Sequence, residues 1–328
     1  MIVTVREHED PARVKDELQG RGLWVQSLRA GARTYFVVEP HSQAVDPAAL
    51  EEIPGVETVA VGASGHPRID AQAPVVQIGR VAVGPGAPPV LMAGPCSVES
   101  ELQVLDIARA LPAHGVRFLR GGAYKPRSSP YAFQGHGPRA LRWLRDAADR
   151  FGLQVVTEAT GAEEVPAVAE VADLIQVGSR SMHAASLLKT IGQTGKPVLL
   201  KRGMSATVEE WLLAGECLLL HGARAVVFCE RGLRSYDPST RNLLDLGAVA
   251  LLAHVHHLPV IVDPSHAAGR RDLILPLAHA GLAAGACGVM VETHPHPAAA
   301  LSDGPQALPL SLLSHLHGSV PVPEAAHG

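Results

Sequence analysis

Residues 89–121 read PVLMAGPCSVESELQVLDIARALPAHGVRFLRG. The runs at 89–94 and 116–121 are short and apolar and lack the polar alternation of a half-exposed strand, so each predicts a strand buried on both faces. Between them, residues 99–115 carry apolar side chains at helical spacing. The stretch therefore predicts a strand, a helix and a second strand, which is the unit of a parallel sheet.

The same unit repeats about every 25 to 30 residues along the rest of the chain. The predicted strands are 89–94, 116–121, 153–158, 173–178, 197–202, 225–230, 259–264 and 287–292. Eight repeats of strand and helix predict an α/β fold of the (β/α)₈ TIM-barrel type rather than an open doubly wound sheet. No G-x-G-x-x-G follows an early strand, so the main signature of a dinucleotide-binding fold is missing.

The first 66 residues predict a separate, small domain. Its expected elements are strands at 2–6, 23–28, 34–39 and 56–61 and helices at 11–20 and 46–53. Strand, helix, strand, strand, helix, strand is the order of a ferredoxin-like α+β unit.

A linker and a hairpin are expected between this domain and the barrel. Gly, Ser, Pro, Ala and Gln mix at 62–74, as in a linker, and VVQIGRVAVG at 75–84 predicts a hairpin that turns at Gly79 and Arg80. The expected domains are a small regulatory-type unit at 1–66, a linker and short hairpin at 67–88, and a catalytic barrel at 89–328.

Composition excludes several classes of protein. A net charge of −4 with mixed acids and bases favours neither nucleic acid nor an anionic membrane as a partner. The polar start does not resemble a signal peptide, and no apolar run approaches the roughly 20 residues that span a bilayer. The four cysteines are widely separated, which argues against a disulfide framework. We therefore expect a cytoplasmic protein with reduced thiols.

Ionisable side chains follow almost every predicted barrel strand, and active sites of this fold lie at the carboxyl ends of the strands. Six of these side chains are cations: Arg120, Lys125, Arg127, Arg180, Lys201 and Arg231. So much positive charge in one pocket requires anions, and Arg and Lys suit phosphate and carboxylate groups. The set predicts two phosphorylated ligands, although any one cation could instead pair with a neighbouring acid.

A second group at the same predicted end is Cys96, His266, Glu292 and Asp303. Thiolate, imidazole and carboxylate ligands suit a divalent transition metal with an open position for substrate. Taken singly, Cys96 could be a small buried hydrophobe and His266 a hydrogen-bonded loop residue. Three other histidines, His254, His256 and His257, precede a strand and are expected to be structural or on the surface, while His294 and His296 are expected beside the metal rather than on it.

Several motifs together resemble those of one enzyme family. They are AGPCSVES, LRGGAYKPRSSPYAFQG, VVTEA, PVLLKRG, FCERGLRSY, VDPSHAAGRRD and VMVETHPHPAAALSDGPQALPL, which span most of residues 89–310. They resemble 3-deoxy-D-arabino-heptulosonate 7-phosphate (DAHP) synthases, the beta subclass of type I, some members of which carry an amino-terminal ferredoxin-like regulatory domain. The related 3-deoxy-D-manno-octulosonate 8-phosphate synthases have K-A-N-R-S-S where this chain has KPRSS.

The resemblance implies a role for each matching residue. Lys125, Pro126, Arg127 and Ser128 would bind erythrose 4-phosphate, and Arg120, Lys125, Arg180, Lys201 and Arg231 would bind phosphoenolpyruvate, with Asp263 in the same substrate pocket. Cys96, His266, Glu292 and Asp303 would hold one Mn²⁺, Fe²⁺, Co²⁺ or Zn²⁺ ion. After Arg180 this chain has Ser-Met-His where relatives have Asn, so the implied contacts end at the arginine.

The implied reaction condenses phosphoenolpyruvate with erythrose 4-phosphate to DAHP and phosphate, the first step of the shikimate pathway to chorismate and the aromatic amino acids. The implied catalytic residues also include Cys96, Lys125 and His266. Glu158 would position or deprotonate the water that adds to C2 of phosphoenolpyruvate. The alternative for Glu158 is a salt bridge to Arg180 or Lys201. The resemblance also implies a homotetramer inhibited by tyrosine or phenylalanine at the amino-terminal domain. An octulosonate synthase and a non-catalytic phosphate sensor are the rival functions.

Overall fold

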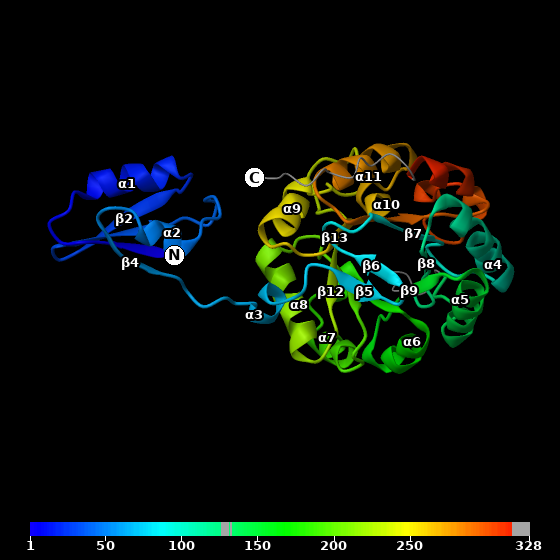
Figure 1. The fold of residues 1–328 in the computed structure, drawn as a ribbon. Coiled ribbons are helices and arrows are strands. Elements are labelled where there is room, and N and C mark those ends of the chain that lie inside the picture. Colours follow the sequence, from blue (N-terminus) through cyan, green and yellow to red (C-terminus); the bar gives the residue numbers. More distant parts are fainter. Residues whose placement is uncertain (126–130, 132, 317–328) are drawn as a thin grey trace. The chain divides into compact units, whose positions relative to one another are not determined.

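The computed structural model describes residues 1–125, 131 and 133–316. Three predicted substrate-binding residues, Pro126, Arg127 and Ser128, lie outside the described residues. The chain divides into two compact units, Met1–Gly65 and His66–Gly328 (Figure 1). No helix in the described ranges is both long enough and apolar enough to cross a bilayer.

Eight parallel strands close into a barrel in the second unit (Figure 1), which confirms the predicted barrel. The strands are β7 (Val90–Gly94), β8 (Phe118–Arg120), β9 (Gln154–Glu158), β10 (Leu174–Val177), β11 (Val198–Lys201), β12 (Val226–Glu230), β13 (Val260–Val262) and β14 (Gly288–Glu292). Each strand pairs with the next one along the chain, and β14 pairs with β7 to close the barrel. All eight carboxyl ends therefore meet at one end of the barrel.

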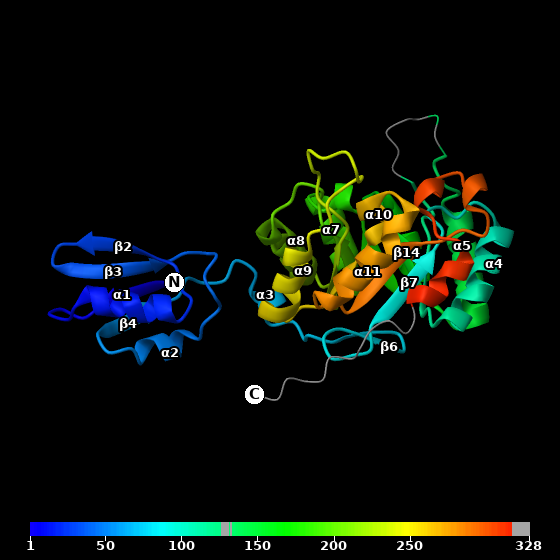
Figure 2. The ribbon, with the colours of Figure 1, turned by 90° about the horizontal axis from the view of Figure 1, so that it is seen from above.

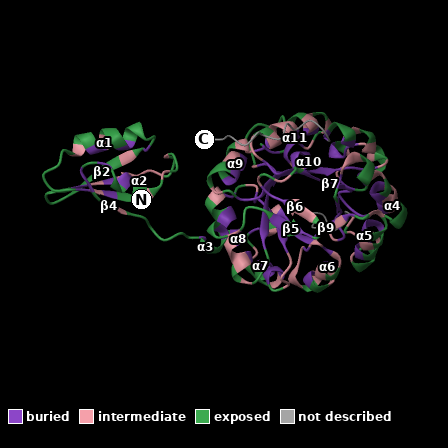
Figure 3. Ribbon diagram, in the orientation of Figure 1, coloured by how far each residue is buried: buried purple, intermediate pink, exposed green. Residues whose placement is uncertain are grey.

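Helices and short helical turns surround the barrel. They are α4 (Glu101–Ala110), η1 (Leu111–His114), α5 (Pro138–Phe151), η2 (Ala162–Glu164), α6 (Val165–Val171), η3 (Ser179–Ser181), α7 (Ala185–Gly192), α8 (Val208–Leu220), α9 (Leu246–Ala250), η4 (Leu251–Val255), α10 (Pro264–Ala268), η5 (Arg271–Leu273), α11 (Ile274–Ala283), η6 (Pro297–Ala299), η7 (Gly304–Gln306) and η8 (Leu310–Leu316). Figure 3 shows buried strands inside this ring, whose outer surface is largely exposed.

Local sequence explains where the larger helices begin and end. The Ser100 hydroxyl accepts a hydrogen bond from the Gln103 N–H at the start of α4, and Thr207 and Glu210 form a capping box at the start of α8. In α5 the apolar residues share one buried face, and Gly152 ends the helix in the left-handed region with φ of 68°.

The amino end of the barrel is closed by a hairpin of β5 (Val76–Ile78) and β6 (Val81–Val83). Val76, Ile78 and Val83 pack in one buried cluster with side chains from the barrel interior, including Met92 and Phe118. Figure 2 shows the hairpin at one end of the barrel. Because this end is filled by apolar side chains, polar chemistry is confined to the opposite, carboxyl end.

The stretch expected to be a linker contains a short helix, α3 (Pro67–Asp70), which corrects that prediction. Ile69 is fully buried against the barrel unit, and the Glu216 carboxylate accepts hydrogen bonds from the backbone N–H groups of Arg68 (2.9 Å) and Ile69 (3.0 Å). The Gln72 side chain bonds both the N–H (2.7 Å) and the carbonyl (3.0 Å) of Val226. The end of the expected linker is thus part of the barrel unit.

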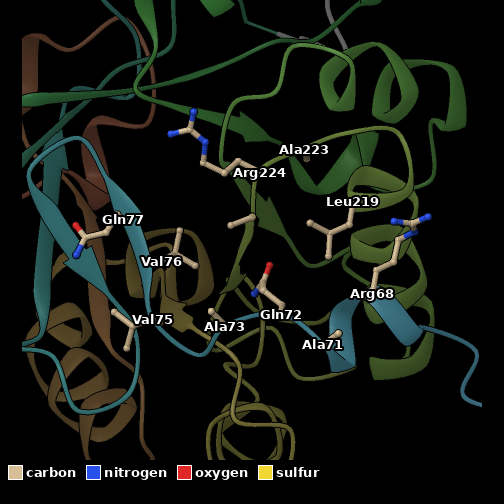
Figure 4. Close-up of a pocket in the computed structure, with 11 residues that line it drawn as sticks. Arg68, Ala71, Gln72, Ala73, Val75, Val76, Gln77, Leu219, Ala223 and Arg224 are labelled. Carbon is tan, nitrogen blue, oxygen red and sulfur yellow. The ribbon is translucent and has the colours of Figure 1, made fainter.

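A pocket of about 550 Å³ lies between the hairpin, α3 and α8 (Figure 4). Its lining includes Val75, Val76, Leu219 and two arginines, Arg68 and Arg224. It is at the amino end, next to the start of β12, and so lies away from the ionisable residues at the carboxyl ends of the strands.

The first unit has its own sheet and core. Its elements are β1 (Ile2–Val5), α1 (Pro11–Gly20), β2 (Val25–Ala30), β3 (Arg33–Val38), α2 (Pro47–Glu51) and β4 (Val56–Ala60), in the order that the sequence predicts. The four strands form an antiparallel sheet in the order β2-β3-β1-β4. Asp10 and Asp46 cap the two helices, and Val3, Leu18 and Phe36 are among the buried residues of the core.

Candidate active site

Three potential metal ligands lie together at the carboxyl end of the barrel. Cys96 follows β7, Glu292 ends β14, and Asp303 precedes η7, and one ligand atom from each lies within 4.8 Å of the other two. The Cys96 Sγ donates a hydrogen bond to Asp303 Oδ2 at 3.0 Å. Cys96 and Asp303 are 207 positions apart in the sequence. The pairing of β14 with β7, which closes the barrel, brings these segments together.

His266, the fourth predicted ligand, stands beside Glu292 at the start of α10. Its backbone N–H and its Nδ1 bond the two oxygens of Asp263, at 3.0 and 2.7 Å, and its Nε2 lies 3.4 Å from Glu292 Oε1. Burial lowers the pKa of His266, and the nearby carboxylates only partly offset this, which favours the neutral ring. Burial alone would raise the pKa of Asp263, but His266 and Lys201 hold it well below its ordinary value.

The ionised Asp263 can only accept hydrogen bonds, so the proton of the neutral ring is on Nδ1. A lone pair on Nε2 then faces a carboxylate oxygen with no proton between them, which is a place for a cation. A buried carboxylate that orients a histidine in this way is a regular feature of metal sites. The donor set of thiol, imidazole and carboxylates therefore fits a transition metal.

The Cys96 thiol is held by Lys125 as well as by Asp303. Lys125 Nζ lies 3.1 Å from the Cys96 Sγ and 3.0 Å from its carbonyl oxygen. Burial, together with Glu292, raises the pKa of the Cys96 thiol to about 12. The thiol is thus protonated in this state, and a metal ion is the partner that would stabilise its thiolate.

Two of the predicted cations are paired with acids inside the site. Arg120 Nη1 donates to Glu292 Oε1 (3.0 Å) and to the Pro95 carbonyl (2.9 Å), and Lys201 Nζ bonds Asp263 Oδ2. The alternative of an ion pair therefore holds for these two residues. Asp263, predicted to bind substrate, has its oxygens occupied by His266 and Lys201, so its contacts in the structure position other side chains.

Arg231, by contrast, has an N–H group that is not hydrogen-bonded to any described residue. It is only 6% exposed, and its Nη1 has no hydrogen-bond partner in the part of the chain that the structure describes. Burial lowers the pKa of Arg231, and Asp263 only partly offsets this. The buried Nε of Arg120 likewise lacks a partner among the described residues. Unpaired guanidinium N–H groups in a buried site indicate an anionic ligand.

Arg180 and Glu158 occupy less buried positions than the buried cations described above. Arg180 is exposed in η3, after β10. Glu158 ends β9, where its Oε2 accepts a hydrogen bond from Gln176 Nε2 at 2.7 Å. Among the described residues, Glu158 forms no salt bridge with Arg180 or Lys201. His294 Nε2 lies 3.5 Å from Glu99 Oε2, and His294 is not part of the three-residue cluster.

Three polar residues that sequence reasoning missed contribute to the site. Arg202 follows Lys201, the last residue of β11, and pairs with Glu230 (3.1 Å) and Asp245 (2.8 Å). Gln306 Nε2 donates to Glu292 Oε2 at 2.6 Å, and Arg241 Nη1 donates to Gln306 Oε1 at 3.0 Å. No sequence pattern indicates these last two contacts.

Comparisons with known proteins agree with this site. Residues 66–319 match the model of the DAHP synthetase I family. A phospho-2-dehydro-3-deoxyheptonate aldolase of Thermotoga maritima is 49% identical over 242 residues, which cover 74% of this chain and 71% of that protein. A 2-dehydro-3-deoxyphosphooctonate aldolase of Acidithiobacillus ferrooxidans is 34% identical over 246 residues, which cover 69% of this chain and 86% of that protein.

Solved structures give the same result. The crystal structure of a Thermotoga maritima phospho-2-dehydro-3-deoxyheptonate aldolase (DAHP synthase) matches with a TM-score of 0.75 and 40% identity, covering 96% of this chain and 94% of that one. A truncated form of the Thermotoga maritima 3-deoxy-D-arabino-heptulosonate 7-phosphate synthase matches with a TM-score of 0.68 and 46% identity, covering 74% and 88% of the two chains. The chain therefore belongs to the DAHP synthetase I family of enzymes.

Proposed function

We propose that this enzyme is a metal-dependent DAHP synthase that condenses phosphoenolpyruvate with erythrose 4-phosphate. The observation that carries the proposal is the pairing of a transition-metal donor set with a buried, partly unpaired arginine at the same end of the barrel. The reaction needs both features, because one substrate is an aldehyde and the other carries a phosphate and a carboxylate. The family and the similarity to the Thermotoga maritima aldolase support the same reaction.

Cys96, His266, Glu292 and Asp303 would hold a divalent ion, one of Mn²⁺, Fe²⁺, Co²⁺ or Zn²⁺. When bound, the ion supplies a Lewis acid for the aldehyde oxygen. Asp263 keeps the His266 lone pair directed at this position, and Arg120 holds one oxygen of Glu292. Lys125, at 3.1 Å from the Cys96 sulfur, would release this contact and turn its ammonium group to substrate.

Phosphoenolpyruvate would lie against Arg231, Arg120, Lys201, Arg180 and Lys125. Free N–H groups on Arg231 and Arg120 offer hydrogen bonds to phosphate or carboxylate oxygens, and the fixed cations would stabilise charge that develops on the leaving phosphate. We propose that Pro126, Arg127 and Ser128 bind the phosphate of erythrose 4-phosphate, together with Lys125. The support for these three residues is the KPRSS sequence, because they lie outside the described residues.

Glu158 is proposed to position the water that adds to C2 of phosphoenolpyruvate. Glu158 is the last residue of β9, and in the described part of the chain its one hydrogen bond, from Gln176 to Oε2, leaves Oε1 available as an acceptor. A carboxylate within reach of water and of the substrate is suited to act as a general base.

The amino-terminal unit is proposed to be a ferredoxin-like regulatory domain that binds tyrosine or phenylalanine, in a homotetrameric, cytoplasmic enzyme. Its strand-helix-strand-strand-helix-strand order and its antiparallel sheet support the ferredoxin-like assignment. The match of the Thermotoga maritima crystal structure over 96% of this chain supports a shared two-part organisation.

A related reaction with arabinose 5-phosphate is the second candidate, because relatives named as octulosonate aldolases are about one-third identical. A competition experiment separates the two. The enzyme is given Mn²⁺, phosphoenolpyruvate and equal amounts of the two sugars, and mass spectrometry identifies the product. We expect the seven-carbon acid phosphate, and an eight-carbon product would contradict the proposal.

A further inference from the structure

Gln306 uses both ends of its side chain inside the site. It is 3% exposed and is the last residue of η7, three positions after Asp303. Its Nε2 donates to Glu292 Oε2 at 2.6 Å, and its Oε1 accepts from Arg241 Nη1 at 3.0 Å. The amide can do this only in one orientation, because only its nitrogen can donate to the Glu292 carboxylate and only its oxygen can accept from the Arg241 guanidinium.

These contacts join two of the three clustered ligands. The same Nη1 of Arg241 lies 3.4 Å from Asp303 Oδ1, so hydrogen bonds run from Glu292 through Gln306 and Arg241 to Asp303. The two oxygens of Glu292 have different partners: Oε2 accepts from Gln306 Nε2, and Oε1 accepts from Arg120 Nη1. With Oε2 held by Gln306, Oε1 is left facing Arg120 and His266.

The turn that carries Asp303 also carries Gln306. Asp303 has a φ of 50°, in the left-handed region, and the Gln306 N–H donates to the Asp303 carbonyl at 3.2 Å. Gly304 cannot accept a side chain here, because an added Cβ would lie 2.4 Å from the Pro297 carbonyl oxygen. The backbone therefore fixes Asp303 and Gln306 relative to each other, and the Gln306 amide transmits this placement to Glu292.

We propose that Gln306 is a positioning residue for the metal: it holds Glu292 and, through Arg241, Asp303 in the arrangement that binds the ion. This inference rests on the proposed metal dependence. A neutral amide suits the role because it supplies a donor to Glu292 and an acceptor to Arg241 without adding charge. Outer hydrogen-bond partners of metal ligands typically contribute 10–100-fold to metal affinity.

The test is Mn²⁺ binding to the full chain, stripped of metal by a chelator and measured by isothermal titration calorimetry. Gln306→Met keeps the volume but removes both hydrogen bonds, and we expect the Kd for Mn²⁺ to rise by about 10–100-fold. Gln176→Met is the matched control, because Gln176 is also 3% exposed and donates to a carboxylate, Glu158, at 2.7 Å. Its Kd for Mn²⁺ should equal that of the natural protein.

The outcomes separate this inference from the proposed function. If the natural protein binds no Mn²⁺, Co²⁺ or Zn²⁺, the proposed metal dependence fails. If it binds and Gln306→Met binds equally well, or if both glutamine variants weaken binding to the same extent, the role of Gln306 is refuted. Should Gln306→Met not fold, Arg241→Met breaks the same chain of hydrogen bonds from its more exposed end, and unchanged Mn²⁺ affinity in that variant would refute the role.

Discussion

At the scale of the residue, the site depends on which polar atoms already have partners. Asp263 illustrates this, because one buried carboxylate orients His266 toward Glu292, beside the proposed metal position, and also holds Lys201. Arg231 illustrates the opposite case, since a buried guanidinium nitrogen has no partner among the described residues. Residues such as Asp263 hold neighbouring side chains in place, whereas residues such as Arg231 can donate a hydrogen bond to a ligand.

Replacing Arg231 by Met should therefore raise the KM for phosphoenolpyruvate. A hydrogen bond to a charged group contributes about 1.5–3 kcal/mol, which corresponds to roughly a 10–100-fold increase in KM. Steady-state kinetics with saturating erythrose 4-phosphate would measure it. Arg224→Met is the control, because Arg224 is exposed at the amino end of the barrel. An unchanged KM in Arg231→Met would mean that Arg231 does not bind phosphoenolpyruvate.

Replacing Cys96 by Ala should weaken metal binding more than replacing a residue that only hydrogen-bonds to a ligand. The variant loses the sulfur ligand itself, so we expect the Kd for Mn²⁺ or Zn²⁺ to rise beyond the roughly 10–100-fold typical of outer partners. Calorimetry on chelator-treated protein measures this. Cys217→Ala in α8, outside the cluster, should bind as the natural protein does. An unchanged Kd in Cys96→Ala would mean that Cys96 is not a metal ligand.

The sequence predicts the four ligands only through the resemblance and through their shared end of the barrel. It could not predict the partners of those ligands. Gln306 contacts Glu292, and Arg241 contacts Gln306 and Asp303, across separate segments of the chain, and no spacing or motif reports such contacts. Asp263 shows the same limit, because its position at a strand end was predicted but its engagement with both His266 and Lys201 depends on three-dimensional packing.

At the scale of the element, the barrel strands were predictable because burial on both faces leaves continuous apolar runs. The eight predicted runs all contain barrel strands. The helix α3 was missed for a physical reason: four residues in a Gly-, Ser- and Pro-rich stretch have no apolar period to detect. It is stabilised by tertiary contacts, namely the burial of Ile69 and the Glu216 carboxylate at its amino terminus.

Asp245 provides a prediction about one element, because it caps α9 and pairs with Arg202. Burial alone would raise its pKa, but hydrogen bonds from Arg202 and the Ala248 N–H outweigh burial and lower it. A depressed pKa in the folded state means that the stabilisation is present above the unfolded value, near 3.9, and is lost as the pH falls through the folded value.

Asp245→Asn should therefore lower the free energy of unfolding by about 1–2 kcal/mol at pH 7, with a smaller difference at pH 3. Urea denaturation at both pH values measures this. The control is Asp272→Asn, which affects an exposed ion pair with Arg270 and should change stability little. An equal loss at the two pH values would contradict a contribution from the ionised carboxylate.

At the scale of the whole molecule, the chain consists of two units with separate cores. Met1–Gly65 encloses its own cluster around Phe36, while the barrel clusters contain only residues from 69 onward. The two-part organisation was predictable from the change in pattern after residue 60. The start of the second unit at His66 was harder to predict, because α3 and the β5–β6 hairpin pack against the barrel and belong to that unit.

Deleting residues 1–65 should leave a folded, active barrel that no longer responds to tyrosine or phenylalanine. The separate hydrophobic cores of the two units support this expectation. Circular dichroism would test folding, and phosphate release with and without each amino acid would test regulation. Inhibition that persists in the truncated chain would place the inhibitor on the barrel instead.

Phosphate release from phosphoenolpyruvate by the full chain is the most direct test of the proposed reaction. It would be made with erythrose 4-phosphate, with arabinose 5-phosphate and with no sugar, each in the presence of Mn²⁺ and of excess chelator. We predict release only with erythrose 4-phosphate and Mn²⁺ together. Release that persists in chelator would contradict the metal site, and no release with any sugar would contradict the proposed synthase.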